Sequence, residues 1–521
     1  MKLKLLTLPA LLAAAALSVP VALAKTPQDT LVIGKSADPQ NLDPAVTMDN
    51  NDWTVTYPAY QRLVRYKVVD GKSSSELEGD LALGWTASAD GLNWEFKLKP
   101  GQRFADGSPV DAAAVKFSFD RLLALKKGPS EPIPEGTQIT VVDPATVRFT
   151  LKSSFAPFLS VLAINGGAIV NPKVMQHEKN GDKAQGWLAA NTMGSGAYQL
   201  TSWQKGQSLV LDKSPQVNGA APAFNKFIVK IVPEASARRL QLQAGDLDIA
   251  EHLPTDQVEG LKKQNGAQGV VVGEYPSLSV TYLYLNNKKA PLDKPEVRRA
   301  IVSAIDVGGI IDGILSGKAK AMNGPIPEGM WGHDAQLKPA AYAPAAAKEA
   351  LAKAGVRNLK LTFSLSERDP AWNPIALATQ ANLAAIGVDI KLESMANATY
   401  RERFGKGDFD IAIGNWAPDF SDPYMFMNYW FQSDKQGAAG NRSFYGNPQV
   451  DALLTQAANS TSQPERLKLY QEAQRIVVGD AAYVYLFQKN IQIAQRANLK
   501  GLQFNPMLEQ IYNVQTMSKS N

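Results

Sequence analysis

The sequence contains no cysteine and only three histidines in 521 residues. Without cysteine there is no disulfide framework and no lipid-modified N-terminal cysteine. The histidines, His177, His252 and His333, lie far apart and show no His-x-x-x-His spacing, so we expect no dedicated metal site and no cofactor. The G-x-S-x-G elbow, the Walker-type phosphate loop and the dinucleotide-binding glycine pattern are also absent. Nothing therefore argues for an enzyme, although a Ser/Lys or paired-acid site would need no contiguous motif.

The chain also has little excess of either sign of charge. Lysine and arginine total 54 against 49 acidic residues, and the formal charge of +5 becomes +3 if Lys2 and Lys4 are removed with an N-terminal leader. Over this length, such a small bias does not indicate a nucleic acid partner. Beyond that leader, no segment approaches the roughly 20 uninterrupted apolar residues that a membrane-spanning helix needs.

The first residues have the order of a secretory signal peptide. Two early lysines precede an apolar run over Leu5–Leu17, and Ala22–Ala24 forms a small-x-small cleavage site. This order predicts removal of residues 1–24 and a mature protein that begins at Lys25. Because no cysteine is available for lipidation, we expect an exported protein without a lipid anchor. Its expected location is the periplasm of a double-membraned bacterium, with the medium as the alternative.

The length exceeds what one hydrophobic core usually serves, so we expect two or three domains. Strands and helices alternate in the second half, which indicates a mainly parallel sheet covered on both faces. The predicted strands there are 281–285, 360–364, 388–392 and 411–414, and the predicted helices are 295–305, 343–354 and 373–386. The first half has a mixed α+β pattern, with a helix over 53–65, a connector at 71–75, a strand over 94–100 and a helix capped by Asp111.

A loop with two carboxylates follows the predicted strand at 411–414. Trp416 precedes Asp419 and Asp422, and further aromatic residues come directly after them. A carboxylate in an aromatic, partly dehydrated loop is suited to bind an ammonium group, because the ion pair is stronger there than in bulk water and ring faces add attraction. Both acids, and Asp422 above all, also have an interpretation as turn formers.

Aromatic residues gather in the predicted loops. Most aromatic residues fill hydrophobic cores, but a group beside carboxylates favours the wall of a ligand cavity. The group consists of Trp53, Trp203, Trp331, Trp372, Trp416, Tyr424 and residues 429–431. These residues alone indicate a protein that binds some ligand, without identifying it.

Several segments, taken in order, resemble the extracytoplasmic solute-binding proteins of the peptide/nickel ABC importer family, which include dipeptide- and oligopeptide-binding proteins. The resemblance is carried by Gly79–Trp85, Asp90–Val110, Gly194–Tyr198, Ala244–Ile249, Leu285–Asn287, Pro295–Ile301, Ala304–Asp306, Gly324–Pro327, Trp416–Pro423 and Asn447–Asp451. These segments extend over essentially the whole mature chain. Their number and order make the resemblance specific.

The resemblance implies an α/β (mixed α+β) chain with a two-lobed periplasmic binding protein fold, an extra inserted subdomain and a hinge between the lobes. The first lobe would comprise 25–62, 194–279 and 492–521, the inserted subdomain 63–193, and the second lobe 280–491. The implied function is capture of short peptides in the interlobe cleft by a monomer that is not an enzyme, and their delivery to an ABC permease in the inner membrane. A metal chelate, an opine or an oligosaccharide is the alternative ligand, and a periplasmic hydrolase or chaperone is the alternative class.

The resemblance also implies a ligand-binding site. In peptide-binding members, the acid that follows Trp-x-x binds the ammonium group of the ligand, and this position is Asp419 here. We expect aromatic residues to line the same site. The candidates are Trp416, Trp53, Trp372 and Tyr424.

The carboxylate of a peptide needs a cation. Arg368 resembles an arginine that some members place shortly before an Asn-Pro helix start, although the spacing here is two residues longer. A solvated loop arginine is the alternative interpretation. Other members place an arginine three residues before the loop tryptophan, where this sequence has Ile413. If Arg368 does not bind the carboxylate, Arg401 and Arg403 are the next candidates.

Overall fold

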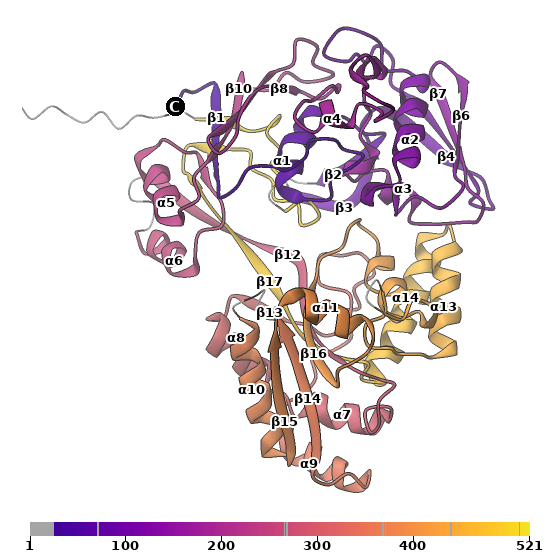
Figure 1. Ribbon diagram of the computed structural model, residues 1–521, viewed down its shortest axis with the longest axis vertical. Helices are drawn as coiled ribbons and strands as arrows, with labels where there is room; N and C mark the ends of the chain where they lie inside the picture. Colours follow the sequence, from indigo (N-terminus) through magenta and orange to yellow (C-terminus); the bar gives the residue numbers. More distant parts are fainter. Residues whose placement is uncertain are drawn as a thin grey trace, which may run out of the picture.

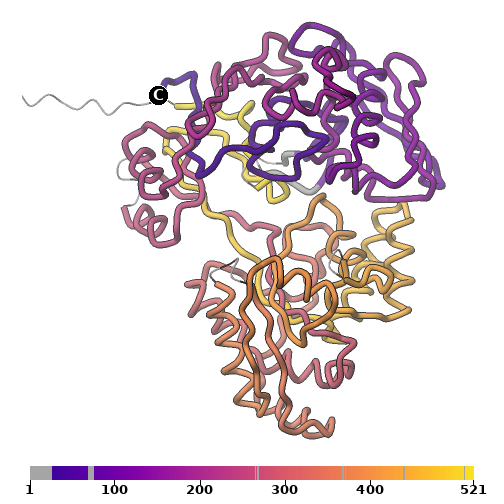
Figure 2. Tube along the Cα trace, in the orientation of Figure 1, coloured from indigo at the N-terminus to yellow at the C-terminus, as the bar shows by residue number. Residues whose placement is uncertain are grey.

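The computed structural model describes residues 26–520 except 70–71, 265, 267–268, 367–368, 370, 438–439 and 510. The predicted leader and Arg368 lie outside the described residues. The described chain forms two lobes joined by long strands (Figure 1). The C-terminal segment returns to the lobe that contains the N-terminal half (Figure 2), where the Lys519 ammonium donates to the Thr30 carbonyl at 2.6 Å.

One 11-stranded sheet runs through both lobes in the order β15-β14-β16-β12-β17-β11-β1-β10-β9-β8, with β13 paired to β17. The first-lobe strands are β1 Thr30–Lys35, β8 Tyr198–Gln204, β9 Ser208–Lys213, β10 Lys226–Ile231 and β11 Ile249–Ala250. The second-lobe strands are β13 Ala319–Ala321, β14 Leu359–Ser366, β15 Val388–Met395 and β16 Ile411–Trp416. The strands β12 Val270–Leu285 and β17 Tyr483–Arg496 belong to both lobes.

The antiparallel pair β12 and β17 connects the lobes (Figure 1). Their ladder shifts register between Pro276 and Val280. Proline has no N–H to donate to a ladder, so backbone pairing is interrupted within the segment that links the two lobes. This places the least regular part of the ladder at the hinge.

The second-lobe sheet is buried on both faces, because side chains of a strand alternate between faces. Leu283 and Leu285 of β12 face one core, whereas Tyr282 and Tyr284 face another. The leucine face packs against α7 Pro295–Ser303, α8 Val307–Leu315, α9 Pro344–Lys353 and α10 Trp372–Ala385. The tyrosine face packs against α11 Asn397–Gly405, α12 Asn428–Phe431, α13 Pro448–Asn459 and α14 Gln463–Gly479.

The first lobe has its own helices, and a smaller sheet is inserted beside it. The first-lobe helices are α1 Asn50–Ala59, α5 Ala235–Ala244 and α6 Thr255–Lys263, and the inserted segment has the short helices α3 Phe158–Val161 and α4 Gln185–Leu188. The small antiparallel sheet has the order β4-β5-β7-β6, with β4 Ala82–Ala87, β5 Asn93–Leu98, β6 Gln138–Asp143 and β7 Thr146–Thr150. The helix α2 Ala112–Leu125 covers it, and the Asp111 carboxylate accepts from the Ala114 N–H at its start, as predicted.

The remaining elements are short. They are the hairpin β2 Val64–Val69 and β3 Lys72–Gly79, the pair β18 Leu499–Lys500 and β19 Ser518–Lys519, and the 3-10 turns η1 Gly128–Ser130, η2 Asn165–Gly167, η3 Pro172–His177, η5 Pro423–Met425 and η6 Ser433–Lys435.

Three predictions about local structure were wrong. The helix predicted over 53–65 ends at Ala59, because Val64, Arg65 and Tyr66 alternate between the inside and the outside as a strand does. The predicted connector at 71–75 is largely part of β3. The second-lobe sheet is mixed, since β14 is parallel to β15 and β16, whereas β12 and β17 run antiparallel to their neighbours.

Candidate functional site

The carboxyl ends of three parallel strands meet at one edge of the second-lobe sheet. In open sheets such an edge is the usual place for a ligand site. Here β14 is followed by α10, β15 by α11, and β16 by the loop that carries both predicted acids. The structure therefore collects side chains from three separate segments at this edge.

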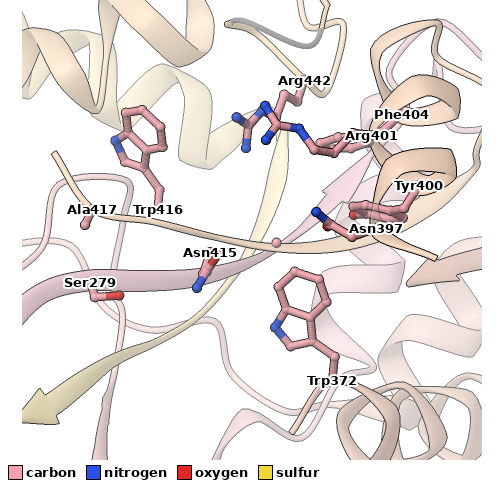
Figure 3. Close-up of a pocket in the computed structure, with 11 residues that line it drawn as sticks. Ser279, Trp372, Asn397, Tyr400, Arg401, Phe404, Asn415, Trp416, Ala417 and Arg442 are labelled. Atoms are coloured by element: carbon pink, nitrogen blue, oxygen red, sulfur yellow. The ribbon is translucent and has the colours of Figure 1, made fainter. Parts of the chain in front are cut away.

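These segments line a cavity of about 360 Å³ (Figure 3). The two tryptophans Trp416 and Trp372 lie on different sides of it in this view, and Arg401 and Arg442 both line it. No acidic residue is among the described residues that line it. The full lining consists of Ser279, Trp372, Asn397, Tyr400, Arg401, Phe404, Gly414, Asn415, Trp416, Ala417 and Arg442.

A glycine is required at one position of this lining. A Cβ atom at Gly414 would lie 2.5 Å from the ring of Tyr284 on the neighbouring strand β12. The absence of a side chain lets the tyrosine core pack directly against the end of β16. This contact brings the buried aromatic core up to the wall of the cavity.

Arg442 lies over an aromatic surface. Its guanidinium carbon is 4.4 Å from the ring centroid of Trp430, 5.8 Å from that of Trp416 and 5.7 Å from that of Phe404. The preceding Asn441 is buried and donates to the carbonyl groups of Tyr445 and Gln432 at 2.8 and 3.1 Å. Backbone contacts thus fix the loop, and ring contacts fix the cation.

Asp419 is a half-buried acid three residues after Trp416 in the loop that follows β16. Within the described part of the chain, its carboxylate has no hydrogen bond and no ion pair. Burial raises the pKa of Asp419 from 3.8 to about 6, and the charge of Glu131, from the inserted subdomain, adds to the rise. Removing an unpartnered carboxylate from water is unfavourable, so this position is suited to an incoming cation.

The acid and the arginine both act on one aromatic pair. The rings of Trp416 and Tyr429 are stacked with centroids 5.3 Å apart. Burial raises the pKa of Tyr429, the positive charge of Arg442 opposes that rise, and the negative charge of Asp419 adds to it. One region of the second lobe therefore presents a negative and a positive group close to the same pair of stacked rings.

Asp422 has a structural role. It is 2% exposed, and its carboxylate accepts from the Arg466 guanidinium at 3.0 and 2.7 Å and from the Tyr424 N–H at 2.9 Å. The pair anchors the start of η5 to α14. The turn-former interpretation therefore describes Asp422, whereas Asp419 has no such contacts.

The other predicted residues lie in different surroundings. Trp53 is 6% exposed in α1, donates from Nε1 to the Thr47 carbonyl at 3.3 Å and does not line the cavity. Tyr424 is half-buried, and its ring lies 5.3 Å from that of Phe155 in an edge-to-face contact with the inserted subdomain. Of the substitute candidates for the cation, Arg401 lines the cavity.

Arg403, the second substitute candidate, forms ion pairs outside the cavity. Its guanidinium pairs with Glu393 at 3.0 Å and with Asp408 at 2.8 Å, and it does not line the cavity. The arginine that sequence reasoning missed is Arg442. Its only sequence signal was its position shortly after the aromatic run at 429–431.

Comparison with known proteins identifies the family. The family model for bacterial extracellular solute-binding proteins, family 5, matches residues 76–438. The chain belongs to this family. It is 56% identical to the probable D,D-dipeptide-binding periplasmic protein DdpA of Escherichia coli K12, over 97% of each chain. It is 29% identical to heme-binding protein A of Haemophilus influenzae, over 88% of this chain and 86% of that protein.

Solved structures of similar proteins agree with the fold. The periplasmic binding protein DppA of Helicobacter pylori, in complex with the peptide STSA, has a TM-score of 0.73 and 29% identity, over 94% of this chain and 98% of that chain. HbpA2 of Haemophilus parasuis has a TM-score of 0.85 and 26% identity, over 94% of this chain and 100% of that chain. The family resemblance and the two-lobed fold predicted from the sequence are thus confirmed.

Two further observations concern the described residues. No helix in that part of the chain combines the length and the apolar character that crossing a membrane requires. No group of three or more His, Asp or Glu side chains among the described residues is placed to hold a metal ion.

Proposed function

We propose that this solute-binding protein captures short peptides at the second-lobe site and delivers them to an ABC permease in the inner membrane. The observation that carries the proposal is the pair of opposite charges, Asp419 and Arg442, which both act on Tyr429, whose ring is stacked on Trp416. A peptide in water has an ammonium group at one end and a carboxylate at the other, so it complements both charges. The names of the E. coli and H. pylori relatives point to the same ligand class.

Asp419 is the proposed partner of the ligand ammonium. Its carboxylate is half-buried without a cationic partner in the described structure, so a ligand cation relieves an existing desolvation cost. The aromatic rings beside it, Trp416 and Tyr429, strengthen the attraction for a cation and cover the ligand backbone.

Short ligands fit this arrangement best. Both charges act on the same side chain, Tyr429, which places them in one small region of the second lobe, and an extended peptide spans about 3.3 Å per residue. We therefore propose a preference for peptides of very few residues, with dipeptides as the first class to test.

We also propose that ligand binding closes the lobes about the β12 and β17 crossing. The proposed boundaries are 25–62, 194–279 and 492–521 for the first lobe, 63–193 for the inserted subdomain and 280–491 for the second lobe. A ligand that contacts both lobes favours the closed state by its differential affinity. The protein acts as a monomer, and its function requires no catalysis.

Calorimetric titration of the purified protein tests the ligand class. We expect a free D,D-dipeptide such as D-alanyl-D-alanine to bind, its N-acetylated form to bind at least about 30-fold more weakly, and mass spectrometry to recover the ligand intact. Preferred binding of an oligosaccharide or a nickel–histidine chelate would favour the alternative ligands, and cleavage of the peptide would favour a hydrolase.

Export is part of the proposal. The order of a basic start, the apolar run Leu5–Leu17 and Ala22–Ala24 supports cleavage after Ala24 and release into the periplasm. N-terminal sequencing of protein from a periplasmic extract should begin at Lys25, and an intact Met1 would contradict cleavage.

A further inference from the structure

The cavity beside Trp416 is rich in positive charge and hydrogen-bond donors. Its described lining includes two arginines, Arg401 and Arg442, and the side-chain amides of Asn397 and Asn415, but no acidic residue. Figure 3 shows both guanidinium groups on the same side of the cavity. Guanidinium and amide donors that converge on one space are suited to an anionic ligand group.

The two arginines differ in how firmly they are held. Arg401 is exposed on α11, where a long side chain keeps its freedom of rotation. Arg442 is half-buried, and its guanidinium lies 4.4 Å from the Trp430 ring. A planar cation stacked on a ring loses little further freedom when it binds, so its position favours strong and directional contacts.

The surroundings of Arg442 also reduce screening by water. Its charge opposes the burial-driven rise in pKa of Tyr284, Tyr400 and Tyr429, which places it among buried or half-buried aromatic side chains from three elements. In such a medium a charge–charge interaction is stronger than at an exposed surface. A carboxylate that enters the cavity therefore gains more from Arg442 than from a solvated arginine.

We infer that Arg442 is the specificity-determining residue for the ligand carboxylate, and that its guanidinium receives the free C-terminus of a peptide whose ammonium group is at Asp419. This inference rests on the proposed peptide-binding function. Both charged anchors then belong to the second lobe, so the ligand is oriented on that lobe alone. Arg401 contributes from the rim of the cavity, and Arg368 is not needed for the role that the resemblance suggested.

The test compares a free-acid dipeptide with its C-terminal amide in calorimetric titrations of the full-length mature protein. Wild-type protein should bind the acid at least about 30-fold more tightly, since the amide removes one charge of a half-buried ion pair. Arg442→Lys keeps the charge but loses the planar donors, and should weaken binding of the acid roughly 10-fold while changing binding of the amide little. Arg442→Gln should abolish the difference between the two ligands.

Arg403→Lys is the matched control, because Arg403 lies on the same lobe but is paired with Glu393 and Asp408 outside the cavity. It should keep the wild-type preference for the acid. Thermal unfolding of each variant separates loss of folding from loss of the contact. Equal losses for acid and amide in a folded Arg442→Lys protein would overturn the inference.

The outcomes also distinguish this inference from the proposed function. Tight and equal binding of acid and amide by wild-type protein overturns the inference and leaves peptide binding intact. A selective loss for the acid in Arg401→Lys, with none in Arg442→Lys, also overturns it. Failure of wild-type protein to bind either dipeptide overturns the proposed function, and the inference with it.

Discussion

Replacement of Asp419 by asparagine should have opposite effects on stability and on binding. The folded, ligand-free protein raises the pKa of this carboxyl from 3.8 to about 6. The folded state therefore binds the proton more tightly than the unfolded chain does. The stabilising contribution of protonation is complete below pH 3.8 and is lost as the pH rises through about 6.

The size of the effect on stability follows from this pKa shift. Each pH unit corresponds to about 1.4 kcal/mol, so the ionised carboxylate lowers the free energy of unfolding at pH 8 by up to about 3 kcal/mol. Because the side chain is half-buried and partly screened, we expect Asp419→Asn to raise the free energy of unfolding by about 1–3 kcal/mol at pH 8, and by little at pH 4.

Ligand binding should change in the other direction. An ammonium group binds the ionised carboxylate, of which about one tenth is present at pH 5 and nine tenths at pH 7. Wild-type affinity for a dipeptide should therefore rise about 10-fold between these values, and fall again near pH 8 and above as the α-ammonium of the ligand, with a pKa of about 8, loses its proton. Asp419→Asn should lose about 2–5 kcal/mol of binding free energy and most of this pH dependence.

Urea unfolding at pH 4 and pH 8, together with calorimetric titrations from pH 5 to pH 8, measures both effects. A less stable Asp419→Asn protein at pH 8 would show that the carboxylate has a structural partner. Normal peptide affinity in that variant would remove Asp419 from the site and refute the proposed ammonium contact.

Three further predictions use the same methods. Asp422→Asn should lower the free energy of unfolding by about 3–5 kcal/mol, since it leaves a buried arginine without its partner; a stable variant in urea unfolding would contradict this role. Glu131→Gln removes a negative charge that raises the pKa of Asp419, so the midpoint of the pH–affinity curve should move to lower pH; an unchanged midpoint would contradict it. The Lys318 ammonium lies 3.2 Å from the Glu259 carboxylate and links the lobes. In urea unfolding, Lys318→Ala should lower the free energy of unfolding by under about 1 kcal/mol in low salt and by less in high salt. A loss of stability that does not depend on salt would refute an ionic link.

Local signals predicted many elements of this fold correctly. The Asp111 cap marks the start of α2, and the helix predicted over 373–386 corresponds to α10. Such elements are set by neighbours in the sequence. The helix predicted over 53–65 failed because its apolar spacing also fits a strand, and only pairing with β3 decides between the two. The prediction of a mainly parallel sheet failed because β12 and β17, which run antiparallel to their neighbours, are far apart in the sequence.

The site was predictable in part. The sequence indicated Trp416 and Trp372, and both line the cavity, because they follow strands whose ends meet at one edge. The local sequence could not separate Asp419 from Asp422, which only the family resemblance did, because the partner of Asp422, Arg466, lies 44 residues further along the chain. It gave no reason to select Arg442, whose place depends on packing between distant segments.

The loop that carries Asp419 also contacts the inserted subdomain, and under the proposed closure this contact would couple ligand binding to lobe movement. The Ser160 hydroxyl of the inserted subdomain donates to the Ser421 carbonyl at 3.1 Å, and Phe155 packs on Tyr424. Asp43 and Arg121 form a buried ion pair between the first lobe and the inserted subdomain, so we expect these two units to move together. An ammonium group that neutralises Asp419 removes its repulsion from Glu131 on the facing subdomain. Under the proposed closure, we therefore expect the ligand to lower the electrostatic cost of bringing Asp419 and Glu131 together.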